Sequence, residues 1–154
     1  MATTAEVLGA VEAAFAEAQK PEHFMQYLGD PECTEHDELL RARSRETLRI
    51  EDVGNICWQP ISYCSPEGMA YYMPSLARLA LAEPTYEFGR YGDTLLIHLS
   101  TSALDNGFLQ FCSREQRLAV ALLLNHLSGM FPEYEMQLAE PDEFRECART
   151  WAAV

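Results

Sequence analysis

The spacing of apolar residues predicts that helices build most of this chain. Near the amino end, Val7, Val11 and Phe15 recur at helical spacing. Thr4 is a residue type that caps helices, so this pattern predicts a first helix from Thr4 to about Gln19.

A second helix is predicted to start at Thr34 and to reach about Arg45, with an acidic first turn and a basic last turn. Arg41, Arg45 and Arg49 would line one face if the helix continued. Asp37 and Arg41 stand four residues apart and are expected to pair. A solvated, salt-bridged face accounts best for these arginines, and a dedicated anion site is the alternative.

The segment 65–81 combines a helix start, an aromatic pair and an internal proline. Ser65 is suited to cap the helix, and Pro66 loses nothing at the first helical position. Pro74 lacks the amide that would bond the preceding turn, and its ring crowds that turn. We therefore expect a kink or break near Met73, after which the helix resumes to Ala82.

Two further helices are predicted near the carboxyl end. Ser113 and Gln116 form a capping box before an apolar stretch that predicts a helix over 114–127. A last helix is predicted from Pro141 to about Trp151.

The stretch 86–99 is less clear, because aromatic residues between turn signals allow a short extended segment there. For 93–99, periodicity does not separate a helix from a strand. Altogether the pattern predicts a mainly α fold: a single compact helical domain over residues 1–154 with about five or six helices.

The segment 65–81 also resembles a family of small bacterial proteins that has no assigned activity. Marks upstream at 33–37 and the helix after Ser113 support the resemblance, which spans about residues 5–130. It implies one compact domain and supplies no substrate, cofactor or catalytic residue. The residues that carry it are Ser65-Pro66-Glu67-Gly68, Tyr71-Tyr72-Met73-Pro74 and Leu76-Ala77-Arg78-Leu79-Ala80-Leu81.

The charge pattern adds a functional expectation. The net charge is −13, and the first 40 residues hold nine carboxylates against the single base Lys20. Such a surface disfavours nucleic acids and anionic membranes and attracts cationic partners. We therefore expect a protein-binding module, resembling an inhibitor or immunity protein, that meets a basic partner without catalysis. The alternative is that the acidity only keeps the protein soluble. The pattern sets no oligomeric state.

Membrane insertion and export are not expected. The longest apolar run, 118–124, is far shorter than a bilayer-spanning helix, and the early residues do not look like a secretory signal. Five cysteines without framework spacing then predict reduced thiols in a cytoplasmic protein.

No arrangement typical of catalysis or cofactor binding stands out. Cys33 and His36 have the spacing of half a zinc site, but the nearby candidates Cys57, Cys64 and His23 do not form a second close pair. No Gly-x-Ser-x-Gly elbow and no phosphate-binding glycine loop is present. We therefore expect no cofactor, no metal and no catalytic residue.

Aromatic residues supply the alternative function. Trp58, with Ile56, Ile61 and Tyr63, is expected to cover the core from a loop over 53–64. On a helix, the neighbours Tyr71 and Tyr72 point about 100° apart, so that one ring could enter the core while the other faces a groove. Core packing is favoured. A small-molecule binder or an enzyme remains the alternative, with a pocket built from Trp58, Glu67, Tyr71, Tyr72 and Arg78.

Overall fold

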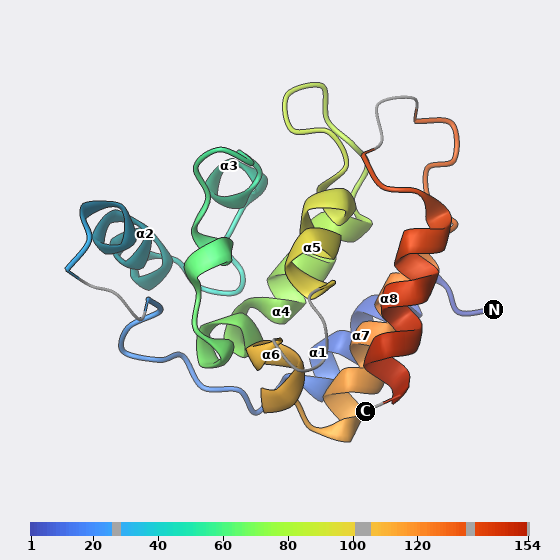
Figure 1. Ribbon diagram of the computed structural model, residues 1–154, viewed down its shortest axis with the longest axis horizontal. Helices are drawn as coiled ribbons and strands as arrows, with labels where there is room; N and C mark the ends of the chain where they lie inside the picture. The colour runs from blue at the N-terminus through green and yellow to red at the C-terminus, as the bar shows by residue number, and fades with distance from the viewer. Residues whose placement is uncertain (26–28, 101–105, 135–137, 154) are drawn as a thin grey trace.

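Helix α4 (Pro66–Leu81) runs through the middle of the molecule and organises the other helices around it. It packs on α1 (Thr4–Ala14), α5 (Tyr91–Leu99) and the short α6 (Gly107–Phe111). Helix α7 (Arg114–Leu127) packs between α1 and α8 (Pro141–Ala153). In this computed structural model, α2 (Pro31–Ala42) and α3 (Ile50–Val53) lie at the side opposite α7 and α8 (Figure 1).

The structure describes residues 1–25, 29–100, 106–134 and 138–153. Within these ranges the fold is a mainly α single domain, in which six helices have seven or more residues and no strand occurs. The mainly α prediction is therefore confirmed. No helix in the described ranges is both long enough and apolar enough to cross a membrane.

Helix α1 is shorter than predicted at its carboxyl end. Thr3, rather than Thr4, caps it, through a capping box with Glu6. The helix ends at Ala14 instead of near Gln19. The carbonyls of Phe15 and Ala18, which follow this end, accept hydrogen bonds from the side chain of Arg45, so they do not need further helical bonds.

Helix α2 begins three residues before the predicted Thr34, because Asp30 accepts a hydrogen bond from the amide of Cys33 and Pro31 occupies the first helical position. It ends at Ala42, so the arginines at 41, 45 and 49 do not share a helix face. Asp37 turns inward instead of pairing with Arg41. Its carboxylate accepts hydrogen bonds from His23 Nδ1 (2.8 Å) and from the amides of Phe24 (2.6 Å) and Met25 (3.3 Å).

Helix α4 continues without interruption past Pro74, so of the predicted kink or break near Met73 the break is wrong. Contacts from a distant turn support the helix around the proline. Arg45 Nε donates to the carbonyl of Tyr71 (2.6 Å), and Ser75 Oγ donates to the carbonyl of Arg45 (2.7 Å). These bonds hold the helix where proline removes one of its own.

The helical alternative for 93–99 is the one that forms, within α5. The segment before it makes a tight turn, in which Thr85 and Gly89 exchange two backbone hydrogen bonds (3.1 and 2.8 Å) and Gly89 has a φ of +67°. Helix α7 spans the predicted 114–127, and its Ser113–Gln116 capping box forms. Helix α6 was not predicted, because five residues carry too little periodicity.

The core is one cluster of apolar side chains contributed by the long helices. Trp151 of α8 is fully buried, and its indole donates to the carbonyl of Leu99 at the end of α5 (2.8 Å). A short helix, η1 (Pro60–Tyr63), contributes Ile61 to this core and contacts α2.

Asp37 makes the stability of this fold sensitive to acid. Burial by itself raises the pKa of its carboxyl, but the hydrogen bonds from His23, Phe24 and Met25 outweigh it and lower the pKa below the usual value. The carboxylate therefore contributes stability at neutral pH, and this contribution is lost as the pH falls through the lowered pKa. We expect Asp37→Asn to reduce the free energy of unfolding by about 1–3 kcal/mol at pH 7 and by less near pH 3, measured by urea denaturation.

Candidate functional site

The residues of the expected aromatic pocket do not share a cavity. Tyr72 is fully buried in the core, and its hydroxyl donates to the carbonyl of Leu40 (2.5 Å). Burial raises the pKa of this phenol. Tyr71 is half-buried and packs edge-on against Tyr72, with ring centroids 4.8 Å apart. The guanidinium of Arg45 covers the Tyr71 ring at 4.8 Å, so neither tyrosine opens into a groove.

Trp58 and Glu67 also lie apart from Arg78. Glu67 is exposed in the first turn of α4, and Trp58 packs against His36 of α2 with ring centroids 5.0 Å apart. Trp58 is 45% exposed, so the expectation that it covers the core is wrong. Ile61, three residues further along the chain, is buried instead.

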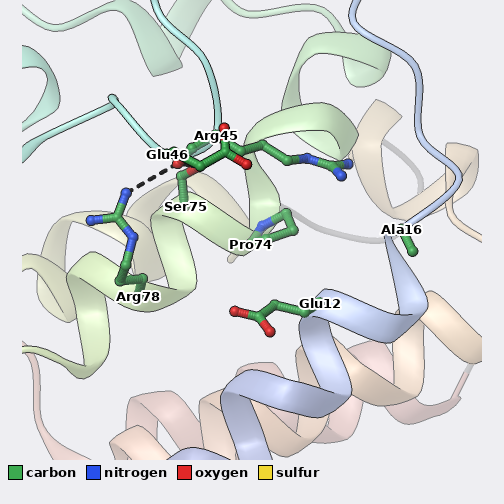
Figure 2. A pocket seen from close by; sticks show the side chains of 7 residues that line it. All are labelled: Glu12, Ala16, Arg45, Glu46, Pro74, Ser75 and Arg78. Atoms are coloured by element: carbon green, nitrogen blue, oxygen red, sulfur yellow. Dashed lines mark hydrogen bonds between the residues drawn. The ribbon is translucent and has the colours of Figure 1, made fainter.

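Of these five residues, Arg78 lines a cavity of about 570 Å³ that contains none of the other four. Glu12 and Ala16 border the cavity from α1 and from the residues just after it. The opposite wall consists of Arg45 and Glu46 in the turn before α3, and of Pro74, Ser75 and Arg78 on α4 (Figure 2). The cavity is open to solvent, and charged side chains stand on both of its sides.

Two arginines line this cavity, but they are held differently. Nε of Arg45 donates a hydrogen bond to the carbonyl of Tyr71. Its Nη2 donates to the carbonyls of Phe15 (2.7 Å) and Ala18 (3.3 Å). Arg78 uses only Nη2, which donates to the carbonyls of Arg45 (3.1 Å) and Leu48 (2.8 Å). Arg45 therefore ties α1 to α4, whereas Nε and Nη1 of Arg78 remain available to a ligand.

The second feature is a surface on α2 that we call the α2 acidic–aromatic face. Its aromatic part is two side chains, Trp58 (45% exposed) and Tyr63 (47% exposed). Both rings pack on the buried ring of His36, at 5.0 and 6.0 Å. The acidic part follows on α2: the face comprises Glu32, Glu35, Glu38, Trp58 and Tyr63.

Helical geometry places Glu32 on the same side of α2 as His36 and the two rings. Glu32 lies one turn before His36 and bonds to it, Oε1 to Nε2 at 3.2 Å. Glu35 lies about 100° and Glu38 about 160° round the helix from His36, both on the exposed side of α2. Residues 31–40 contain no lysine or arginine, and the exposed Arg41 follows in the last turn of α2.

The exposed carboxylates extend beyond this face. Of the nine in the first 40 residues, Glu32 is half-buried and Asp37 is buried, and the others are exposed. The expected acidic exterior of the amino-terminal third is therefore present. These carboxylates favour the approach of positively charged partners to this part of the protein.

The cysteine and histidine residues do not assemble a recognisable centre. Cys33 is buried on α2 and His36 bonds to Glu32, and no group of three or more metal-ligand side chains occurs in the described part of the chain. Burial raises the pKa of Cys112 and of Cys147 to about 12, which keeps these thiols protonated and poor nucleophiles. Burial also lowers the pKa of His98 to about 4.

Comparison with known proteins adds no further assignment. No family model, no curated protein and no solved structure matches this chain.

The sequence interpretation missed several residues that the structure places at these sites. Tyr63 was assigned to the core cover, and Glu12, Arg45 and Ser75 were not connected with Arg78. Between 33 and 66 positions separate Glu12, Arg45 and Arg78 in the chain. No local pattern marks their approach, because helix packing alone brings them together.

Proposed function

We propose that this protein is an acidic protein-binding module that engages a basic partner through the α2 acidic–aromatic face. The observation that carries the proposal is the exposure of Trp58 and Tyr63 against α2, whose residues 31–40 include three carboxylates besides Asp37 and no lysine or arginine. Tryptophan and tyrosine supply much of the binding energy at protein interfaces, typically from the centre of the contact.

Charge complementarity specifies the partner. Carboxylates at the edge of an interface accelerate association with a positively charged surface and repel acidic competitors. An arginine of the partner could also stack on the face of Trp58 as a cation–π contact. The partner that suits this surface is a protein with clustered lysine and arginine around an apolar centre.

The role that follows resembles that of an inhibitor or immunity protein, which covers a basic functional surface of another protein. Such a role requires no reaction at the face itself. The buried, protonated thiols agree with a binding role, since they leave Cys112 and Cys147 without nucleophilic character.

The test is selection of ligands from a random peptide library displayed on phage, with the whole protein immobilised. We expect the selected peptides to be rich in Lys and Arg and to carry an aromatic or aliphatic anchor. Calorimetry with the best peptide should show weaker binding at higher salt. In a ¹H–¹⁵N NMR titration, the indole signal of Trp58 and the amides of α2 should shift most.

Variants distinguish binding through this face from attraction by the net charge of the whole protein. Trp58→Ala should weaken binding on the order of 30-fold, and Glu35→Lys with Glu38→Lys on the order of tenfold. The matched control, Glu17→Lys with Glu146→Lys, makes the same change in net charge at exposed positions elsewhere. Equal losses in both double variants, shifts that map away from α2, or failure to select any peptide that binds there would refute the proposal.

A further inference from the structure

Opposite charges face each other across the cavity without meeting. Glu12 extends from α1 into the space that Arg78, Ser75 and Pro74 border from the other side (Figure 2). The side chain of Glu12 makes no hydrogen bond or ion pair with the described residues. Arg78 makes no ion pair with them, and only its Nη2 is used. A carboxylate and the Nε and Nη1 donors of a guanidinium are thus both available to the same open space.

We propose that this cavity binds a small zwitterion of the α-amino acid class. The carboxylate of the ligand would accept from Nη1 of Arg78, and its ammonium group would donate to Glu12. A hydrogen bond from a charged guanidinium to a carboxylate is shorter and stronger than one between neutral groups.

Electrostatics favours a zwitterion over a simple anion. The protein carries a net charge of −13, and Glu12 and Glu46 both border the cavity. Hydrogen bonds from its own amide and from Ser44 lower the pKa of Glu46, and Arg45 and Arg78 lower it further, so this carboxylate stays ionised. An anion without a positive group would meet this negative field, whereas an ammonium group is attracted by it.

The remaining walls of the cavity favour an amino-acid ligand with a side chain of moderate size. Pro74 and Ala16 give apolar surface, and the Ser75 hydroxyl already donates to the carbonyl of Arg45, which leaves only its oxygen as an acceptor. The volume of about 570 Å³ lies within the range of small-molecule sites. An aliphatic amino acid such as leucine matches these walls. This site involves α1 and α4, so it is independent of the face proposed for protein binding.

The test is calorimetry of the whole protein with L-leucine as the probe. Two half-ligands serve as comparisons: 4-methylpentanoate keeps the carboxylate, and 3-methylbutylamine keeps the ammonium group. We expect L-leucine to bind at least tenfold more tightly than either half-ligand, because only the zwitterion pairs with both sides.

Single variants test which group of the ligand each charged side chain binds. Glu12→Gln should weaken L-leucine binding roughly tenfold and leave 4-methylpentanoate unaffected, and Arg78→Lys should weaken both. The side chain of Glu12 makes no bond with the described residues, so Glu12→Gln keeps the test valid even if Arg78→Lys loses stability. Glu146→Gln on α8 is the matched control and should change nothing.

Three outcomes would overturn the inference. One is the absence of L-leucine binding to the unchanged protein. Another is equal affinity for L-leucine and 4-methylpentanoate, which would indicate a plain anion site. The third is a strong energetic coupling of Glu12 with Arg78 in a double-mutant cycle of stability, which would show that they close into an ion pair of their own.

Discussion

Arg45→Ala should lower the free energy of unfolding by about 3 kcal/mol or more, although Arg45 is only half-buried. The substitution removes the donors to the carbonyls of Phe15 and Ala18 after α1, and the donor to Tyr71 on α4. It also removes the cation that covers the ring of Tyr71. Urea denaturation followed by circular dichroism measures the change.

Two control variants sharpen this result. Arg45→Lys keeps the charge but not the planar fork, so it should recover only part of the lost stability. Arg149→Ala removes an exposed arginine of α8 and should change stability by less than about 0.5 kcal/mol. If Arg45→Ala behaved like Arg149→Ala, the side chain would not join α1 to α4 as described.

Asp93→Ala should be the most damaging substitution at the other end of the molecule, with a loss of about 3–5 kcal/mol. Asp93 is 3% exposed and accepts from Nε of Arg90 (2.8 Å) and from its Nη2. Its other oxygen accepts from the amide of Leu138 (3.0 Å). Without Asp93, the guanidinium of Arg90, which is only 6% exposed, would lose its counter-ion in the interior.

Removing both charges separates the cost of an unpaired charge from the value of the pair. Arg90→Met with Asp93→Leu leaves no buried charge, so this double variant should lose less stability than Asp93→Ala alone. Thermal unfolding of the three proteins at one salt concentration makes the comparison. A double variant less stable than Asp93→Ala would show that the further bond of Arg90 to the carbonyl of Ala139 (3.0 Å) matters more than charge burial.

Arg45 and Arg90 differ in role from the charged residues of the two proposed sites. Arg45 and Arg90 bond several backbone carbonyls and join segments that are distant in the chain. Arg78 has donors to spare, and the acids of α2 have few partners of their own. Arg45 and Arg90 therefore stabilise joints between segments, whereas Arg78 and the acids of α2 have groups available to a ligand.

The candidate sites were predictable only in part. The acidic amino-terminal third could be predicted because exposure of carboxylates is the rule for unpaired charges. Arg78 lines a cavity, but the four residues expected beside it there, Trp58, Glu67, Tyr71 and Tyr72, do not line this cavity. Tyr72 became core and Trp58 became surface, since the direction of an aromatic ring depends on which helix covers it.

The sequence by itself determined those helices whose boundaries rest on local chemistry. The capping box at Ser113 and Gln116 marks α7 correctly, and Ser65 with Pro66 marks the start of α4. Caps and apolar periodicity act within one or two helical turns, so a linear sequence contains the whole signal.

Only the tertiary structure decided how α4 passes Pro74, where α1 ends and which charges face one another. Each of these depends on Arg45 or on the packing of α1 against α4, and the contacts join residues about 26 to 30 positions apart. Such contacts exist only after the helices have packed, because the free energy that forms them comes from burial of the shared core.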